Sequence, residues 1–192
     1  MPVRHEHSSW VLRHEYCAMS AMRRVLGIDP GLTATGFGVV DSDGSTSRLV
    51  VTGAFRTRPR DERAQRLGVI AERVGALIEE HHPDEMAIEQ QYVAKNVRTA
   101  MAIGEARAAA MVAAAMRAVP VFQYPPTEIK QCVAGYGAAP KEQVRQMVMV
   151  HLGLSEEPES FDASDALAIA LTRLAEARMD AILARSASAG RT

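Results

Sequence analysis

The stretch VLGIDPGLTATGFGVV, residues 25–40, places a single acid, Asp29, between two apolar runs. Residues 25–28 and 36–41 are predicted to be strands, because short apolar runs on either side of a glycine-rich turn are typical of a hairpin. An aspartate before Pro-Gly often does no more than start a turn. At the end of a strand it can also be a metal or phosphate ligand, so Asp29 has a structural and a functional interpretation.

The rest of the chain continues as alternating strands and helices. Further strands are expected at residues 49–55, 85–89 and 119–124. Apolar residues at helical spacing predict longer helices at about residues 67–81, 98–118, 141–152 and 164–183. Thr127 is expected to cap a short helix that ends near residue 133. This order of elements predicts an α/β fold with a mixed five-stranded sheet flanked by helices.

Composition limits the classes of protein that the chain can be. It has 192 residues, 47% of them hydrophobic and 23% charged, which is typical of one globular domain. The formal net charge of −1 is unusual for a DNA-binding domain. No long window lacks charges and no secretory signal is evident, so we expect no membrane span. Two cysteines, Cys17 and Cys132, do not make a disulfide framework, which favours the cytoplasm.

The two ends of the chain differ from its middle. Residues 1–21 hold the only tryptophan and three of the six histidines, His5, His7 and His14, whose irregular spacing argues against a metal site. We expect residues 1–21 to be a disordered extension. Residues 22–183 are expected to be one domain and residues 184–192 a frayed tail.

Three further acids occupy positions comparable to that of Asp29. Glu89 ends the predicted strand at 85–89, where it has no helix to cap. Asp162 and Asp165 are three residues apart at the start of the last helix, which puts both on one face. Each aspartate also has a structural interpretation there, as a helix cap or as a charge that favours the helix dipole. Four acids brought together would repel each other unless cations neutralise them, and carboxylates favour magnesium or manganese.

Four segments carry a specific resemblance: GIDPGLTATGFGVV, AIEQQYVAKN, KQCVAGYGAAPKEQV and DASDALAIA. In this order they resemble the signature segments of the RuvC family, Holliday junction resolvases with a ribonuclease H-like fold, and the resemblance covers residues 22–174. Residues 22–183 would then be a ribonuclease H-like nuclease domain. The resemblance implies a homodimeric, cytoplasmic endonuclease that resolves four-way DNA junctions in recombination and repair, with the RuvA and RuvB branch-migration complex as partner.

The resemblance also assigns roles to residues. Asp29, Glu89, Asp162 and Asp165 stand at the catalytic acid positions and would hold two Mg²⁺ per active site, which Mn²⁺ can replace. Two such metals can activate water and stabilise the leaving oxygen, so that two opposed strands are nicked symmetrically to give 5′-phosphate and 3′-hydroxyl ends.

Basic and aromatic residues in the same segments are the expected DNA contacts: Tyr92, Lys95, Arg98, Lys130 and Lys141. Lys130 and Lys141 would also stabilise charge at the scissile phosphate. Tyr92 stands where many family members have phenylalanine, and its ring can still stack on bases. The alternative for each lysine is a solvated surface position, and for Tyr92 a half-buried core position.

The alanine-rich helix at 98–118 is the expected dimer contact, with an internal core helix as the alternative. Three other classes of protein compete with the resolvase. Actin-like ATPases and sugar kinases share the first segment but need a much longer chain. A resolvase-like family that acts on ribosomal RNA precursors is expected to be shorter and to lack DASDALAIA. A non-catalytic junction-binding protein would have lost one of the acids, and none is missing.

Overall fold

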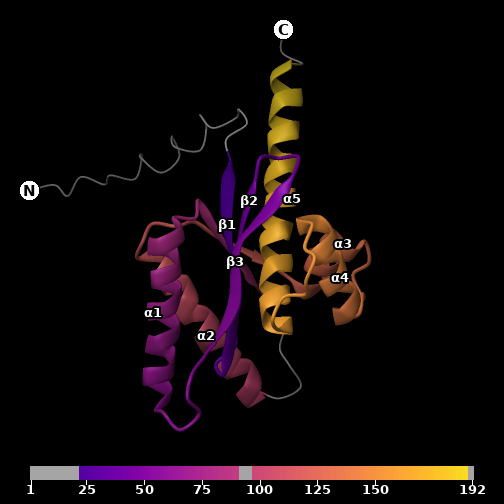
Figure 1. The fold of residues 1–192 in the computed structure, drawn as a ribbon. Helices are drawn as coiled ribbons and strands as arrows, with labels where there is room; N and C mark the ends of the chain where they lie inside the picture. The colour runs from indigo at the N-terminus through magenta and orange to yellow at the C-terminus, as the bar shows by residue number, and fades with distance from the viewer. Residues whose placement is uncertain (1–21, 91–96, 190–192) are drawn as a thin grey trace, which may run out of the picture.

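A computed structural model describes residues 22–90 and 97–189 (Figure 1). Its centre is a mixed sheet of five strands in the order β3-β2-β1-β4-β5. The first three strands pair antiparallel, whereas β4 and β5 run parallel to β1. The strands are β1 (Arg23–Asp29), β2 (Ala34–Ser42), β3 (Ser47–Arg56), β4 (Glu85–Glu89) and β5 (Val121–Tyr124). The predicted mixed five-stranded sheet is therefore confirmed.

Helices cover both faces of the sheet (Figure 1). They are α1 (Arg63–His81), α2 (Val97–Ala115), α3 (Pro126–Ala134), α4 (Lys141–Leu152) and α5 (Phe161–Ala189). Helices α1 and α2 pack on one face, and α5 lies on the other with α3 and α4 behind it. Among the described residues, no helix is long and apolar enough to cross a membrane.

The strand β1 is buried on both faces, because it lies in the middle of the sheet. Its side chains alternate: Val25 belongs to the core cluster under α5, whereas Leu26 and Ile28 belong to the cluster under α1 and α2. All three are fully buried. Because of this period of two, the odd-numbered residues of β1 face α5. Asp29 therefore lies on the α5 face, at the end of the strand.

An ion pair anchors α5 to the far end of β4. Arg173 and Glu85 are both buried, and Arg173 Nε lies 2.7 Å from Glu85 Oε2. Glu85 also accepts a hydrogen bond of 2.5 Å from Arg23 at the start of β1. The Arg173 guanidinium stacks 3.7 Å from the centre of the Phe122 ring. These contacts fix the position of α5 along the sheet, two to three turns after its acidic start.

Several helix ends differ from the predicted ones: α1 begins at Arg63 instead of about residue 67, and α2 ends at Ala115 instead of about residue 118. Helix α3 has Pro125 at its N-cap with no side-chain cap, so the prediction that Thr127 caps it is wrong. Helix α5 begins at Phe161, three residues before the predicted start, and continues to Ala189. Residues 184–189 are therefore helical rather than frayed. The expectation of disorder for residues 1–21 falls outside the described residues.

Candidate active site

Two of the four predicted acids end neighbouring parallel strands. Asp29 is the last residue of β1 and Glu89 the last of β4, and the register of these strands pairs Ile28 with Ile88 just before them. The alternation that buries Ala87 under α5 also points Glu89 to that face. Both carboxylates therefore reach the same side of the same sheet edge, where ligands gather in folds of this kind.

The other two acids arrive on the first turns of α5. The hydroxyl of Ser160 accepts a hydrogen bond of 3.1 Å from Ala163 N, which caps this end of the helix. The main-chain oxygen of Asp162 lies against Gly36, the ladder partner of Asp29, and a Cβ on that glycine would come within 1.9 Å of it. Asp165 follows one turn later. The start of α5 thus lies directly over the end of β1.

A cavity of about 250 Å³ collects most of the predicted catalytic side chains. Its lining consists of Asp29, Glu89, Pro126, Ile129, Lys130, Lys141, Val144, Asp165 and Ala168. Three carboxylates and two amines thus share one small space between β1, β4, α3, α4 and α5. Asp162 does not line this cavity, although its charge acts on Asp29 from the preceding turn of α5.

Burial and like charge disfavour ionisation of the two strand-end acids. Burial, followed by the charges of Glu89 and Asp165, raises the pKa of Asp29 to about 7. Burial and the charge of Asp165 also raise the pKa of Glu89. Raised pKa values at neighbouring carboxyls mean that too little positive charge surrounds them to stabilise their ionised forms. Such a site favours a bound cation.

The two lysines supply part of the missing positive charge. Lys141 Nζ lies 2.7 Å from Asp165 Oδ2. Burial lowers the pKa of Lys141, but the hydrogen bond to Asp165 and the nearby carboxylates outweigh it, so the net shift is upward. Lys130, on α3, lowers the pKa of Glu89 through its charge. Lys141 is 60% exposed, which leaves it accessible to a substrate phosphate.

The donor atoms fit a hard divalent cation. All four acids offer carboxylate oxygens, the ligand type that magnesium and manganese prefer. Within residues 22–90 and 97–189, however, no three His, Cys, Asp or Glu side chains are close enough to form a complete ligand set. Lys141 occupies one side of Asp165 instead. Binding of a metal by these acids therefore requires their side chains to move from the positions seen here.

The predicted DNA contacts divide into three groups. Lys130 and Lys141 line the cavity. Arg98 lies exposed in the first turn of α2 and does not line it. Tyr92 and Lys95 lie outside the described residues, so their predicted roles remain predictions.

Sequence reasoning missed the residues that position the acids. Gly27, like Gly36, lies under α5, where an added Cβ would come within 2.0 Å of Ala166 O. Arg145 donates a hydrogen bond to Pro158 O and lies 4.9 Å from the Phe161 ring centre, which holds the loop before α5. The glycine spacing in GIDPGLTATGFG was the available signal, since alternate glycines on paired strands permit a close helix.

Comparison with known proteins agrees with this geometry. The family model described as crossover junction endodeoxyribonuclease RuvC matches residues 25–173. A protein of that name from Chromohalobacter salexigens is 50% identical, covering 77% of this chain and 78% of the relative. Another, from Geobacter sulfurreducens, is 45% identical, covering 83% of this chain and 97% of the relative.

A solved structure gives the same result in three dimensions. It is that of T. thermophilus RuvC in complex with Holliday junction substrate, with a TM-score of 0.79 and 40% identity. The match covers 83% of this chain and 97% of that one. The shared architecture is the ribonuclease H-like resolvase fold. On sequence and on fold, the chain belongs to the RuvC family of crossover junction endodeoxyribonucleases.

Proposed function

We propose that this protein resolves Holliday junctions by metal-dependent nicking of two opposed DNA strands. The observation that carries the proposal is the convergence of Asp29, Glu89 and Asp165 with two lysines in one cavity, with Asp162 one turn away. Family membership identifies the bond that is cut as a DNA phosphodiester. The substrate follows by analogy with the T. thermophilus relative, which was solved with a Holliday junction.

The four acids would hold the metal, proposed as two Mg²⁺ per site with Mn²⁺ as a substitute. Bound there, the metal would supply Lewis acidity for attack by water and for departure of the leaving oxygen. Hydrolysis adds the water oxygen to phosphorus and breaks the bond to O3′. The products are a 5′-phosphate and a 3′-hydroxyl, and the proton released by water balances the one that O3′ gains.

The lysines would hold the scissile phosphate. Lys141 stands at the cavity mouth, 2.7 Å from Asp165, so its amine can exchange this carboxylate for a phosphate oxygen when a cation binds the acids. Lys130 approaches from α3 on the side of Glu89. Tyr92, Lys95 and Arg98 are proposed to contact DNA outside this cavity.

A homodimer would match the two-fold symmetry of a junction. Helix α2 and the turn that follows it carry a row of exposed apolar side chains: Val97 (65% exposed), Met101 (60%) and Val112 (55%) on the helix, and Met116 (79%) in the turn. Their spacing places them along one side of the helix, away from the buried alanines. We assign this row to the dimer contact, because exposed large apolar side chains on one side of a helix favour association. RuvA and RuvB are proposed as functional partners in the cytoplasm.

Nicking of a synthetic mobile four-way junction tests the proposal. We expect paired symmetric nicks with magnesium or manganese and none with a chelator. Duplex DNA and structured RNA of matched length should stay intact. The variant Glu89→Gln should bind the junction and cut at least about 10²-fold more slowly, since it lacks a charged ligand.

The outcomes separate the competing functions. Trimming of RNA with an intact junction would favour an RNA-processing enzyme. Binding of the junction without any cutting in either metal would make the protein a junction-binding module. Loss of junction binding in Glu89→Gln would mean that this acid is structural.

A further inference from the structure

The turn that follows Asp29 is tied to the end of β3. Residues 30–33 form this turn, which connects β1 to β2. Leu32 O accepts a hydrogen bond of 2.6 Å from the hydroxyl of Thr57, and Thr33 O accepts one of 3.1 Å from Thr57 N. Thr57 follows directly after β3 and is buried. One buried residue thus fixes two consecutive carbonyl groups of the turn.

Arg66, at the end of the first turn of α1, completes this network. Its Nη2 donates to Leu32 O at 3.1 Å and to the hydroxyl of Thr33 at 3.2 Å. Its Nε donates to the hydroxyl of Thr57 at 2.8 Å. One guanidinium therefore joins the turn, the end of β3 and α1. Arginine suits this task because its donors form a rigid planar fork.

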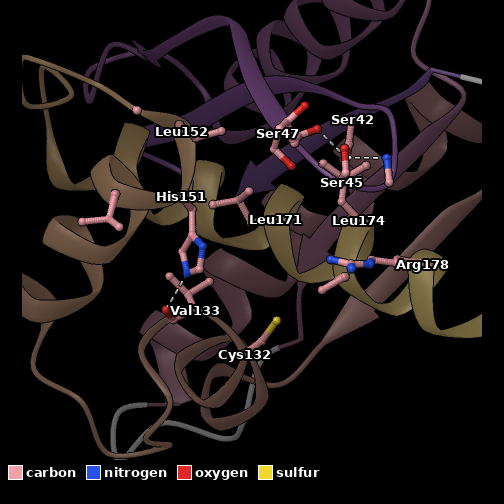
Figure 2. Close-up of a pocket in the computed structure, with 15 residues that line it drawn as sticks. Ser42, Ser45, Ser47, Cys132, Val133, His151, Leu152, Leu171, Leu174 and Arg178 are labelled. Atoms are coloured by element: carbon pink, nitrogen blue, oxygen red, sulfur yellow. Dashed lines mark hydrogen bonds between the residues drawn. The ribbon is translucent and has the colours of Figure 1, made fainter.

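The β2–β3 turn, at the opposite end of the sheet, is stabilised from within. The hydroxyl of Ser42 donates to Thr46 O at 2.9 Å and accepts a hydrogen bond of 3.1 Å from Gly44 N, as Figure 2 shows. A turn of this sheet can thus be stable through its own residues. The bonds from Arg66 therefore point to a specific need at the turn after Asp29.

Arg66 acts on Asp29 through the turn and not through its charge. The pKa of Asp29 is shifted by burial and then by four charged groups, none of which is Arg66: Glu89, Asp165, Lys141 and Asp162. The backbone of Asp29, however, continues directly into residues 30–33. A movement of this turn would therefore change the direction of the Asp29 carboxylate relative to the other acids.

We propose that Arg66 is a positioning residue for the metal site: it fixes the turn after Asp29, and the turn fixes the direction of the Asp29 carboxylate. The inference rests on the proposed function, which places a metal ion at Asp29. Arg66 does not line the cavity of the acids. Residues that orient metal ligands from behind typically change metal affinity or activity by about 10–100-fold when they are replaced. Since Arg66 acts through the backbone, its effect belongs at the lower end of that range.

Binding of Mn²⁺ to the full-length protein tests the proposal without any DNA. Electron paramagnetic resonance follows the free ion and gives its dissociation constant. Arg66→Met keeps the aliphatic stem and removes every donor, so this constant should rise about tenfold. Thr57→Val, which removes the hydroxyl at the centre of the network, should change it in the same direction. Arg66→Lys can reach only some of the acceptors at once, so it should lie between Arg66→Met and the wild-type protein.

Junction cutting separates positioning from DNA binding. At a fixed Mg²⁺ concentration, Arg66→Met should lower kcat and leave KM for the junction unchanged, because the metal site is affected and the DNA contacts are not. A higher Mg²⁺ concentration should restore much of the lost rate. A raised KM with an unchanged kcat would overturn the inference, since Arg66 would then be a DNA contact.

Arg63→Met is the matched control, because Arg63 lies three residues earlier on α1 and pairs with Glu105 on α2 instead of with the turn. Its affinity for Mn²⁺ should equal that of the wild-type protein. Equal affinities in Arg66→Met and Arg63→Met would overturn the inference. So would a loss in Arg66→Met that appears only as a lower midpoint of urea unfolding, since Arg66 would then be purely structural. A wild-type protein that binds no Mn²⁺ would overturn the proposed function, and the inference with it.

Discussion

The main-chain oxygen of Asp162 lies where a side chain on Gly36 would have to be, 1.9 Å from the position of its Cβ. Helix α5 therefore meets β2 with no side chain between the two backbones. Gly36 is also the ladder partner of Asp29. One glycine thus sets how closely the acids of α5 approach the acid of β1.

The change Gly36→Ala should damage both the stability and the site. Its methyl group cannot be accommodated without moving the helix backbone, and overpacking of this kind costs about 1–3 kcal/mol. A displaced α5 moves Asp162 and Asp165 away from Asp29. We expect a lower midpoint of chemical unfolding and a larger loss of junction cutting than the lost stability explains.

Gly68→Ala is the matched control, because nothing lies within 4 Å of a Cβ at that position in α1. Alanine favours a helix over glycine by about 1 kcal/mol, so this variant should be slightly more stable and fully active. Equal behaviour of the two variants would show that close approach at Gly36 is unimportant.

Arg173 is expected to be a stability residue and not a catalytic one. Replacing it with methionine leaves Glu85 buried without its main partner, which typically costs about 3–5 kcal/mol. Arg23 still donates to Glu85, so the loss should fall at the lower end of that range. The double variant Arg173→Met, Glu85→Met should recover much of the loss in urea unfolding. A double variant as unstable as the single one would contradict this account.

Strand-end patterns placed Asp29 and Glu89 at one edge of the sheet, because a residue at the end of a buried strand must point to one face of the sheet, whereas their catalytic role came from the resemblance. How closely α5 packs on the sheet could not be predicted from local sequence pattern. Gly36 permits this close packing only because α5 is the helix that covers it. The predicted cap of α3 was wrong for a local reason. Two prolines, Pro125 and Pro126, already fix the backbone at the N-terminus, so Thr127 has no cap to supply.

The metal-free protein should lose stability as the pH rises from about 4 to 7. The pKa of Asp29 is raised by burial and neighbouring acids from 3.8 to about 7 in the folded protein. A raised pKa means that the folded state binds the proton more tightly than the unfolded chain does. This contribution is complete below the unfolded value and is lost as pH rises through the folded one.

Chemical unfolding in a chelator, at pH 5 and pH 7.5, measures this effect as the difference between the wild-type protein and Asp29→Asn. The wild-type protein should lose roughly 1–3 kcal/mol more than the variant over that interval. Magnesium should reduce the wild-type loss, since it binds the ionised carboxylates. Parallel pH profiles for the two proteins would mean that Asp29 ionises freely.

The row of exposed side chains on α2 predicts a dimer that one charge can weaken. Met116 is the most exposed member, at 79%, so Met116→Glu leaves the fold intact while placing a carboxylate in the proposed contact. A buried carboxylate in an apolar contact should weaken association by about 1.4 kcal/mol or more, so the dissociation constant should rise tenfold or more. Sedimentation velocity over a range of concentrations measures this dissociation constant.

Met179→Glu, a change at a methionine of α5 that is 56% exposed, should leave association unchanged. If Met116→Glu sediments like the wild-type protein, α2 is not the contact. If it becomes monomeric and still makes paired nicks in a junction at the wild-type rate, symmetric cutting does not require the dimer.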